Sequence, residues 1–170
     1  PLLPLFTQEF GISETTSSLT ISVALFVLGI SFFLYTALSD AYGRRNIIIL
    51  AMVLGTLGTL AISLAPTFEW LLAARIFQAA ALAGIPVAAM AYISEEYKVR
   101  AMSVAVGIYI SCNSIGGMSG RVISGVLTDL WDWRFAFLVM TILSVFILLL
   151  GYFLFAKSKQ FTSSPFHLKG

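Results

Sequence analysis

Five long apolar runs divide this chain of 170 residues, and each is about twenty residues or more in length. A helix rises about 1.5 Å per residue, so such a run can cross the roughly 30 Å hydrocarbon core of a bilayer. Strands of a transmembrane barrel would need only about ten residues of alternating polarity. The runs therefore predict five membrane-spanning helices, at residues 19–38, 46–65, 68–93, 101–128 and 135–156.

The composition supports lipid as the solvent for most of the chain. Hydrophobic residues make up 59% of it and charged residues 11%, whereas roughly a quarter of a soluble domain is charged. A soluble core of this size cannot bury so much apolar surface, so we expect an all-α polytopic integral membrane protein. No basic tract indicates a nucleic-acid partner. No nucleophile–base set or metal-ligand spacing indicates an enzyme, a metal site or a cofactor.

Lys and Arg gather in alternate connections between the predicted spans. Seven lie on one side and only Arg134 lies on the other, so the positive-inside rule places the first side in the cytoplasm. The segment 1–18 is then an exterior loop with room for a short helix, and 157–170 begins a cytoplasmic linker. Five spans that start outside indicate a fragment whose first helix is missing. The seven basic residues are Arg44, Arg45, Lys98, Arg100, Lys157, Lys159 and Lys169.

The connection between the first two predicted spans, DAYGRR at residues 40–45, holds the most specific pattern. A tight turn at Gly43 and the positive-inside rule explain the glycine and the arginines. They do not explain Asp40, because the helix dipole disfavours an anion at a helix C-terminus. Asp40 should therefore have a specific partner, and Arg44 is the nearest candidate. We expect this pair to latch two helix bundles on the cytoplasmic side and to break when they rock.

At these residues the chain resembles the major facilitator superfamily, whose second helix is followed by the signature G-x-L-A-D-R-x-G-R-K/R. Thr36 replaces the leading glycine of the signature, and Ala41 replaces its first basic residue. The resemblance implies that the cluster is a cytoplasmic gating motif. The residues in register with the signature are Leu38, Asp40, Gly43, Arg44 and Arg45.

A second resemblance lies in the third predicted span, where Arg75, Gln78 and Ala79 follow the family's R-x-x-Q-G pattern with Ala for Gly. Arg75 lies about seven residues into the span, or roughly 10 Å deep. Its side chain could snorkel to the outer interface, but a charge within a membrane usually faces a cavity or a partner. The resemblance implies that Arg75 takes part in proton coupling, and Gln78 is a candidate for the substrate cavity.

The fourth predicted span resembles a glycine motif of the family's exporter branch, with Gly107, Gly116 and Gly120 at the motif's spacing. Glycines four residues apart let two helices approach closely, so we expect these three to pack helices. Arg121 takes the place of a proline in the motif.

The same span also carries a polar face, on which Asn113, Gly117, Arg121 and Ser124 fall together. Arg121 is open to two interpretations, snorkelling or facing a cavity. Tyr109 and Asn113 are candidate substrate contacts, although either could instead bond between helices. Both intramembrane charges, Arg75 and Arg121, are positive, which favours an anionic or neutral polar substrate over a cationic drug.

Two smaller groups need no functional role. Trp131 and Trp133 match the aromatic belt of a membrane interface, and Trp133, Arg134 and Phe137 repeat a W-R-x-x-F pattern of the family. Glu95 and Glu96 share a connection with Lys98 and Arg100, which indicates a solvated charge cluster.

The resemblance implies the N-terminal half of a twelve-helix transporter built from three-plus-three repeats, with its binding site near the midplane between the halves. The implied function is secondary active transport of a small molecule by alternating access, as proton-coupled efflux in a bacterial inner membrane. The proton gradient would supply the energy without a cofactor. The partners would be the substrate, lipid, the missing first helix and the C-terminal six helices. The alternatives are a proton-coupled uptake symporter and a non-transporting receptor or assembly protein on the same scaffold.

Overall fold

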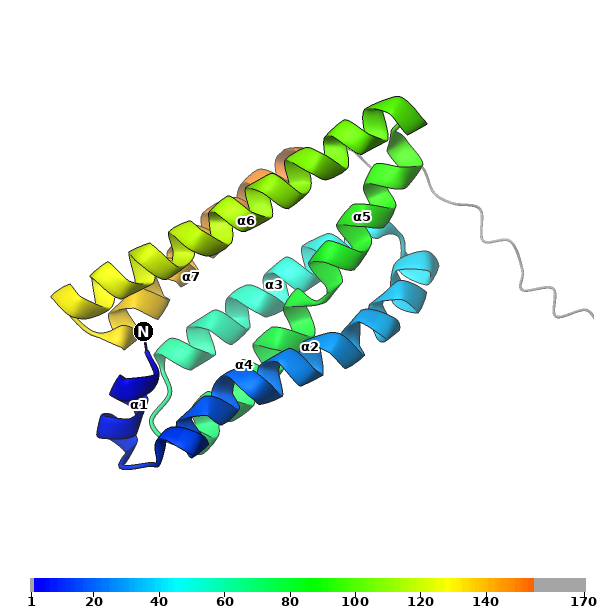
Figure 1. Cartoon of the computed structure of the whole chain (residues 1–170). Coiled ribbons are helices and arrows are strands. Elements are labelled where there is room, and N and C mark those ends of the chain that lie inside the picture. Colours follow the sequence, from blue (N-terminus) through cyan, green and yellow to red (C-terminus); the bar gives the residue numbers. More distant parts are fainter. Residues whose placement is uncertain (1, 155–170) are drawn as a thin grey trace, which may run out of the picture.

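The protein is a bundle of long helices, seen here in a computed structural model that describes residues 2–154 (Figure 1). Five spans among these residues are long and apolar enough to cross a membrane: α2, α3, α4 together with α5, α6, and α7. The described residues thus form an all-α multi-pass membrane bundle. The helices are α1 (Leu3–Phe10), α2 (Glu14–Tyr42), α3 (Arg44–Ser63), α4 (Phe68–Leu82), α5 (Gly84–Glu96), α6 (Val99–Leu130) and α7 (Trp133–Leu154).

Several helices extend beyond the apolar runs that predict them. The segment 1–18 holds the short helix α1 and the first turn of α2, so little of it is an irregular loop. Helix α2 starts at Glu14 because Ser13 caps it, its Oγ accepting a hydrogen bond from the amide of Thr16 at 3.1 Å. Helix α6 runs from Val99 to Leu130, beyond the predicted 101–128. Residues 155–156 of the last predicted span and the predicted linker 157–170 lie outside the described residues.

The third predicted span, 68–93, is broken into α4 and α5 at Ala83. Pro86 lies four residues after Leu82 and has no amide hydrogen, so the carbonyl of Leu82 cannot receive its usual helical hydrogen bond. The break therefore comes one turn before the proline. Gly84 permits close packing at this point, because a Cβ there would lie 2.8 Å from the ring of Tyr35 in α2.

Helix α3 occupies the centre of the bundle, with α4, α5 and α7 packed around it (Figure 1). Half of its most apolar stretch is buried, the largest share of any span. Buried residues Ile47, Ile48, Ala51 and Ile62 belong to it. Helix α3 contacts α2, α4, α5 and α7, whereas α6 is attached through α5 and α7.

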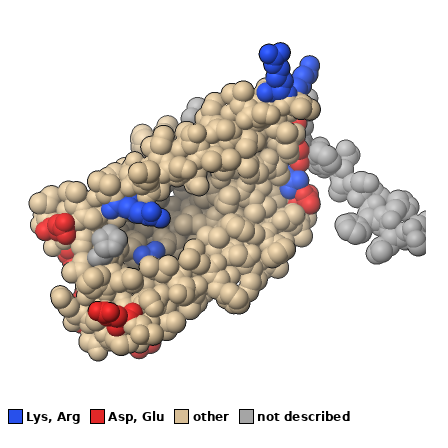
Figure 2. Space-filling model, viewed as in Figure 1, with Lys and Arg blue, Asp and Glu red and all other residues tan. Residues whose placement is uncertain are grey.

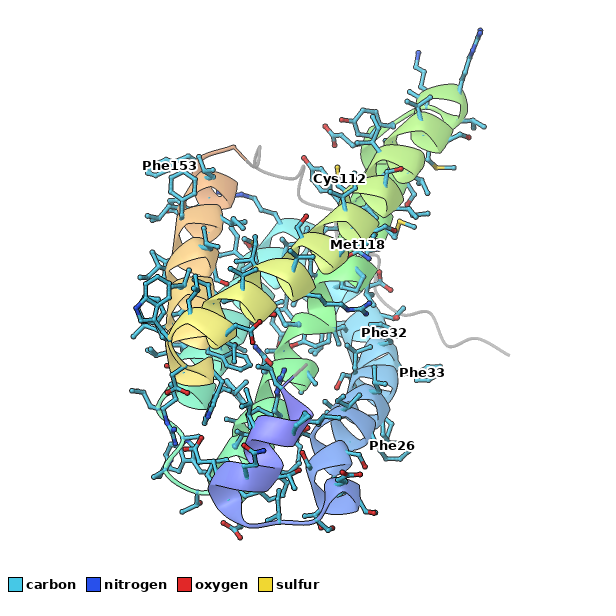
Figure 3. All side chains as sticks on the ribbon, turned by 60° about the vertical axis from the view of Figure 1, so that its left-hand side comes forward. Phe26, Phe32, Phe33, Cys112, Met118 and Phe153 are labelled. Carbon is cyan, nitrogen blue, oxygen red and sulfur yellow. The ribbon has the colours of Figure 1, made fainter. Side chains whose placement is uncertain are left out.

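Helix α6 crosses the bundle on its outside, against α7 and the end of α5 (Figure 1). None of its apolar stretch is buried within the described residues. On the opposite flank, α2 directs large aromatic side chains away from the bundle, and Figure 3 shows Phe26 and Phe33 pointing outward. Such exposed apolar surface is the normal lipid-facing side of a membrane helix.

Candidate functional site

Arg44 joins three elements at the end of the bundle predicted to be cytoplasmic. Its Nη2 lies 2.5 Å from Oδ1 of Asp40, at the end of α2. Its Nε donates to Oε1 of Glu95, at the end of α5, at 2.9 Å. Its Nη1 donates to the hydroxyl of buried Ser39 at 2.9 Å. We call Ser39, Asp40, Arg44 and Glu95 the inner network.

The turn at Gly43 makes this geometry possible. Gly43 is the single residue between α2 and α3, and its φ of 85° lies in the region that only glycine adopts easily. Because the turn is so short, Arg44 starts α3 directly beside Asp40. Arg45 contacts α7, where its Nη2 donates to the carbonyl of Tyr152 at 3.4 Å.

The inner network contains the predicted pair of Asp40 and Arg44 and corrects the expectation for Glu95. Glu95 is expected in a solvated charge cluster, but it is an ion-pair partner of Arg44, 51 residues away along the chain. The role of Asp40 and Arg44 as a latch between two bundles stays a prediction, because the described residues form one bundle. Ser39 had no sequence signal beyond its position next to Asp40.

A second polar cluster lies inside the bundle, between α3 and α4. Arg75 donates from Nη1 to Oε1 of Gln78 at 3.3 Å, and Nε2 of Gln78 donates to Oγ1 of Thr59 at 2.7 Å. The hydroxyl of Thr59 in turn donates to the carbonyl of Gly55 at 2.9 Å. We call Thr59, Arg75 and Gln78 the buried polar cluster. It joins two of the predicted site residues and adds Thr59, which the sequence did not single out.

Arg75 is held within the bundle rather than directed to the interface. Its guanidinium carbon lies 5.0 Å from the centre of the Phe137 ring in α7, within the range of a cation–π interaction. Its Nε is buried and has no hydrogen-bond partner among the described residues. Arg75 thus contacts α4 and α7 and retains an unused donor in a low-dielectric region.

Two glycines allow α3 and α4 to approach closely around this cluster. A Cβ at Gly58 would lie 2.8 Å from Cβ and 2.9 Å from Cα of Gln78. A Cβ at Gly55 would lie 2.4 Å from the side chain of Leu82. The close glycine contacts predicted for α6 are therefore found in α3. Within the described part of the chain, nothing lies within 4 Å of a Cβ built at Gly107, Gly116 or Gly120.

The remaining candidates lie on α6, which the buried polar cluster does not reach by any described contact. Tyr109 is half-buried, whereas Asn113 and Arg121 are exposed. Ser124, on the same polar face, is half-buried. Figure 2 shows that the surface beside α6 is hollowed, with basic side chains in this region and acidic ones gathered toward the two ends.

An outer cluster at the other end of the bundle was not predicted. The carboxylate of Glu9 in α1 accepts hydrogen bonds from the indole Nε1 of Trp133 and from Nη1 of Arg134. Nη2 of Arg134 also donates to the carbonyl of Ala65, just after α3, at 2.8 Å. Trp133 is only 2% exposed and packs against Phe6. The belt interpretation is therefore wrong for Trp133, whereas Trp131 is 65% exposed, as a belt residue would be.

The sequence of the chain matches the model of a known protein family. The family model described as Major Facilitator Superfamily matches residues 1–167. The chain belongs to this superfamily. It is 35% identical over 162 residues to the uncharacterized MFS-type transporter YybF of Bacillus subtilis, covering 95% of this chain and 40% of that protein.

Two further relatives are similar to this chain. The inner membrane transport protein YnfM of Escherichia coli is 39% identical over 136 residues, covering 80% of this chain and 33% of YnfM. The multidrug resistance protein Stp of Mycobacterium tuberculosis is 32% identical over 171 residues, covering 99% of this chain and 32% of Stp. The chain thus spans less than half the length of each of these three relatives.

Proposed function

We propose that this chain forms part of a secondary active transporter that moves a small molecule across a bacterial inner membrane by alternating access. The observation that carries the proposal is the buried polar cluster, in which Arg75 is held inside an apolar bundle. A charge within a membrane span is expensive and marks a substrate or ion pathway more often than a structural site. The names of YybF, YnfM and Stp, all transport or resistance proteins, support this function.

Proton-coupled efflux is the form of transport that we favour. Stp is named a multidrug resistance protein, and the glycine spacing of α6 resembles the exporter branch. Arg75 would then tune a titrating carboxylate supplied by a part of the full-length protein outside this chain. Uptake by symport uses the same residues and differs only in the direction of substrate flux.

The inner network, with Gly43 and Arg45, would serve as the cytoplasmic gating motif. Arg44 holds the ends of α2, α3 and α5 together, so these helices would move as one unit. The side chain of Asp40 is 61% exposed, whereas that of Arg44 is 16% exposed. Asp40 is therefore the member of the network that can also contact the second half of the full-length protein.

The test uses the full-length protein in proteoliposomes with an imposed pH gradient. Asp40→Asn should lower substrate-driven proton flux about tenfold, equivalent to about 1.4 kcal/mol in the transport barrier. Membrane insertion should be unchanged. Glu96→Gln is the matched control, since the structure shows no ion pair for Glu96 within its described part. Normal flux in Asp40→Asn at normal expression would remove the gating role.

Arg75→Gln tests the coupling role in the same vesicles. We expect substrate exchange without a pH gradient to persist while proton-driven flux is lost. A panel of sugars, drugs and organic acids that elicits no proton flux from the wild-type protein would argue for a receptor or assembly protein. Substrate moving with the protons, rather than against them, would establish symport.

A further inference from the structure

The W-R-x-x-F pattern at the start of α7 has no part in the proposed function, yet it lies between the outer cluster and the buried polar cluster. Trp133 and Phe137 are four residues apart, so they share one face of α7. Their rings meet edge to face, with 6.2 Å between the centroids and 82° between the planes. The guanidinium carbon of Arg75 lies over the ring of Phe137, 5.0 Å from its centre. Phe137 thus touches a member of each cluster.

The start of α7 is held by two other elements. Glu9 of α1 accepts hydrogen bonds from Nε1 of Trp133 and Nη1 of Arg134. Arg134 also donates from Nη2 to the carbonyl of Ala65, just after α3, at 2.8 Å. The ring of Phe6 in α1 meets that of Trp133 edge to face, with 5.2 Å between the centroids. The indole ring is therefore fixed at its nitrogen and by its neighbour, and it has little freedom to turn.

Phe137 covers a cation that few polar groups reach. Nη1 of Arg75 donates to Oε1 of Gln78 at 3.3 Å, which is slightly longer than a usual hydrogen bond. Nε of Arg75 is buried and has no hydrogen-bond partner among the described residues. A cation shielded from water is attracted more strongly to the face of an aromatic ring than an exposed cation is. The ring of Phe137 therefore limits the directions in which the guanidinium can point.

We propose that the W-R-x-x-F pattern positions Arg75 for proton coupling. Phe137 is the positioning residue, and Trp133 and Arg134 support it from the outer end of α7. This inference rests on the proposed coupling role of Arg75 and deepens it, because it adds a control exerted by α7. A displacement of the outer end of α7 would move Phe137 away from the guanidinium, so Arg75 would respond to the state of the outer face.

Fluorine NMR of the purified full-length protein tests the contacts and needs no substrate. 4-Fluorophenylalanine replaces Phe137, or it replaces Phe135 as the matched control, since Phe135 lies two residues away and is 39% exposed. Arg75→Gln should shift the resonance of the label at position 137 and leave that of the label at position 135 in place. Glu9→Gln should also shift the resonance at position 137, because it weakens the support of Trp133. An unchanged resonance at position 137 in either variant, or equal shifts of both labels, would overturn the inference.

The proteoliposome assay tests the positioning role. Phe137→Leu keeps an apolar side chain against the cluster that includes Ile62 and Leu71, but it has no ring face. We expect it to lower the ratio of proton-driven flux to gradient-free exchange about tenfold. Phe137→Tyr keeps the ring and should restore most of the ratio, and Phe135→Leu should leave it unchanged. Equal losses of flux and exchange in Phe137→Leu would show that Phe137 only packs, and would overturn its positioning role.

The variants of Arg75 and Phe137 separate this inference from the proposed function. If Arg75→Gln abolishes proton-driven flux while Phe137→Leu leaves the ratio unchanged, the coupling role stands and the positioning role is wrong. If Arg75→Gln leaves proton-driven flux intact, the coupling role itself is wrong, and the role of Phe137 in coupling is overturned with it. The NMR shifts would then still show whether Phe137 holds the guanidinium.

Discussion

Helices α3 and α6 have similar apolar character but opposite surroundings. Helix α3 packs against α4, α5 and α7, and half of its apolar stretch is buried. Helix α6 has no buried residue and meets the bundle only toward its ends. Both contain pairs of closely spaced glycines, yet only Gly55 and Gly58 of α3 lie against a neighbouring helix.

The difference shows that a glycine pair indicates close packing only when a partner helix is present. In lipid, apolar burial gives little drive for helices to associate, so close van der Waals contact and polar bonds decide which faces meet. Helix α3 uses both against α4, through Gly58 and through the bond between Thr59 and Gln78. No described residue lies within 4 Å of a Cβ built at the corresponding glycines of α6, Gly116 and Gly120.

The largest expected contrast between the packed and open regions concerns two tryptophans two residues apart. Trp133→Ala should lower the free energy of unfolding by about 3–5 kcal/mol, because it empties a buried site next to Phe6 and removes a donor to Glu9. Trp131→Ala, at the end of α6, should change it by no more than about 0.5 kcal/mol. Denaturant titration of both variants measures the difference. Equal losses would mean that α6 is as tightly packed as the rest.

A smaller effect on stability comes from replacing a glycine with alanine, and its sign should differ between α3 and α6. Gly58→Ala should destabilise the protein by about 1–3 kcal/mol, since the new Cβ would meet the backbone of Gln78. Gly116→Ala should instead be neutral or stabilise α6 by up to about 1 kcal/mol through helix propensity. Thermal unfolding of the purified variants gives both signs. A loss at Gly116 as large as that at Gly58 would show that another part of the full-length protein packs on this glycine.

The smallest expected effect on stability compares a polar residue packed between α3 and α4 with an exposed one on α6. Gln78→Ala should destabilise the protein by about 1–2 kcal/mol, because it removes the acceptor of Arg75 and the bond to Thr59. Asn113→Ala should change the free energy of unfolding by no more than about 0.5 kcal/mol, because this side chain is exposed. Denaturant titration of both variants measures the difference. A stability loss in Asn113→Ala as large as that in Gln78→Ala would make Asn113 a packing residue.

The sequence predicts features that depend on neighbours along the chain. The five spans follow from the length of the apolar runs, and the break between α4 and α5 has a local cause in Pro86. The pairing of Asp40 with Arg44 could be inferred because four residues separate them and a glycine turns the chain between them. In each case the physical cause acts within one or two helical turns.

Features that depend on contacts between distant segments could not be predicted in this way. Glu95 reaches Arg44 only because α5 ends beside the α2–α3 turn. The sequence alone indicates a belt residue at Trp133, but in the structure α1 covers its ring and Glu9 accepts a hydrogen bond from its indole Nε1. Closely spaced glycines likewise permit close helix packing without specifying a partner. Within the described residues, the glycines of α3 lie against α4, whereas those of α6 lie against no neighbouring helix.

Two arginines, one from α3 itself and one from α7, hold the two ends of α3. Arg44 opens it and is fastened to α2 and α5, while Arg134 grips the carbonyl of Ala65 just beyond its last turn. At about 1.5 Å per residue, the 20 residues of α3 span about 30 Å, and polar contacts tie both of its ends to other elements. Sliding α3 along its own axis would therefore break contacts at both ends of the bundle at once.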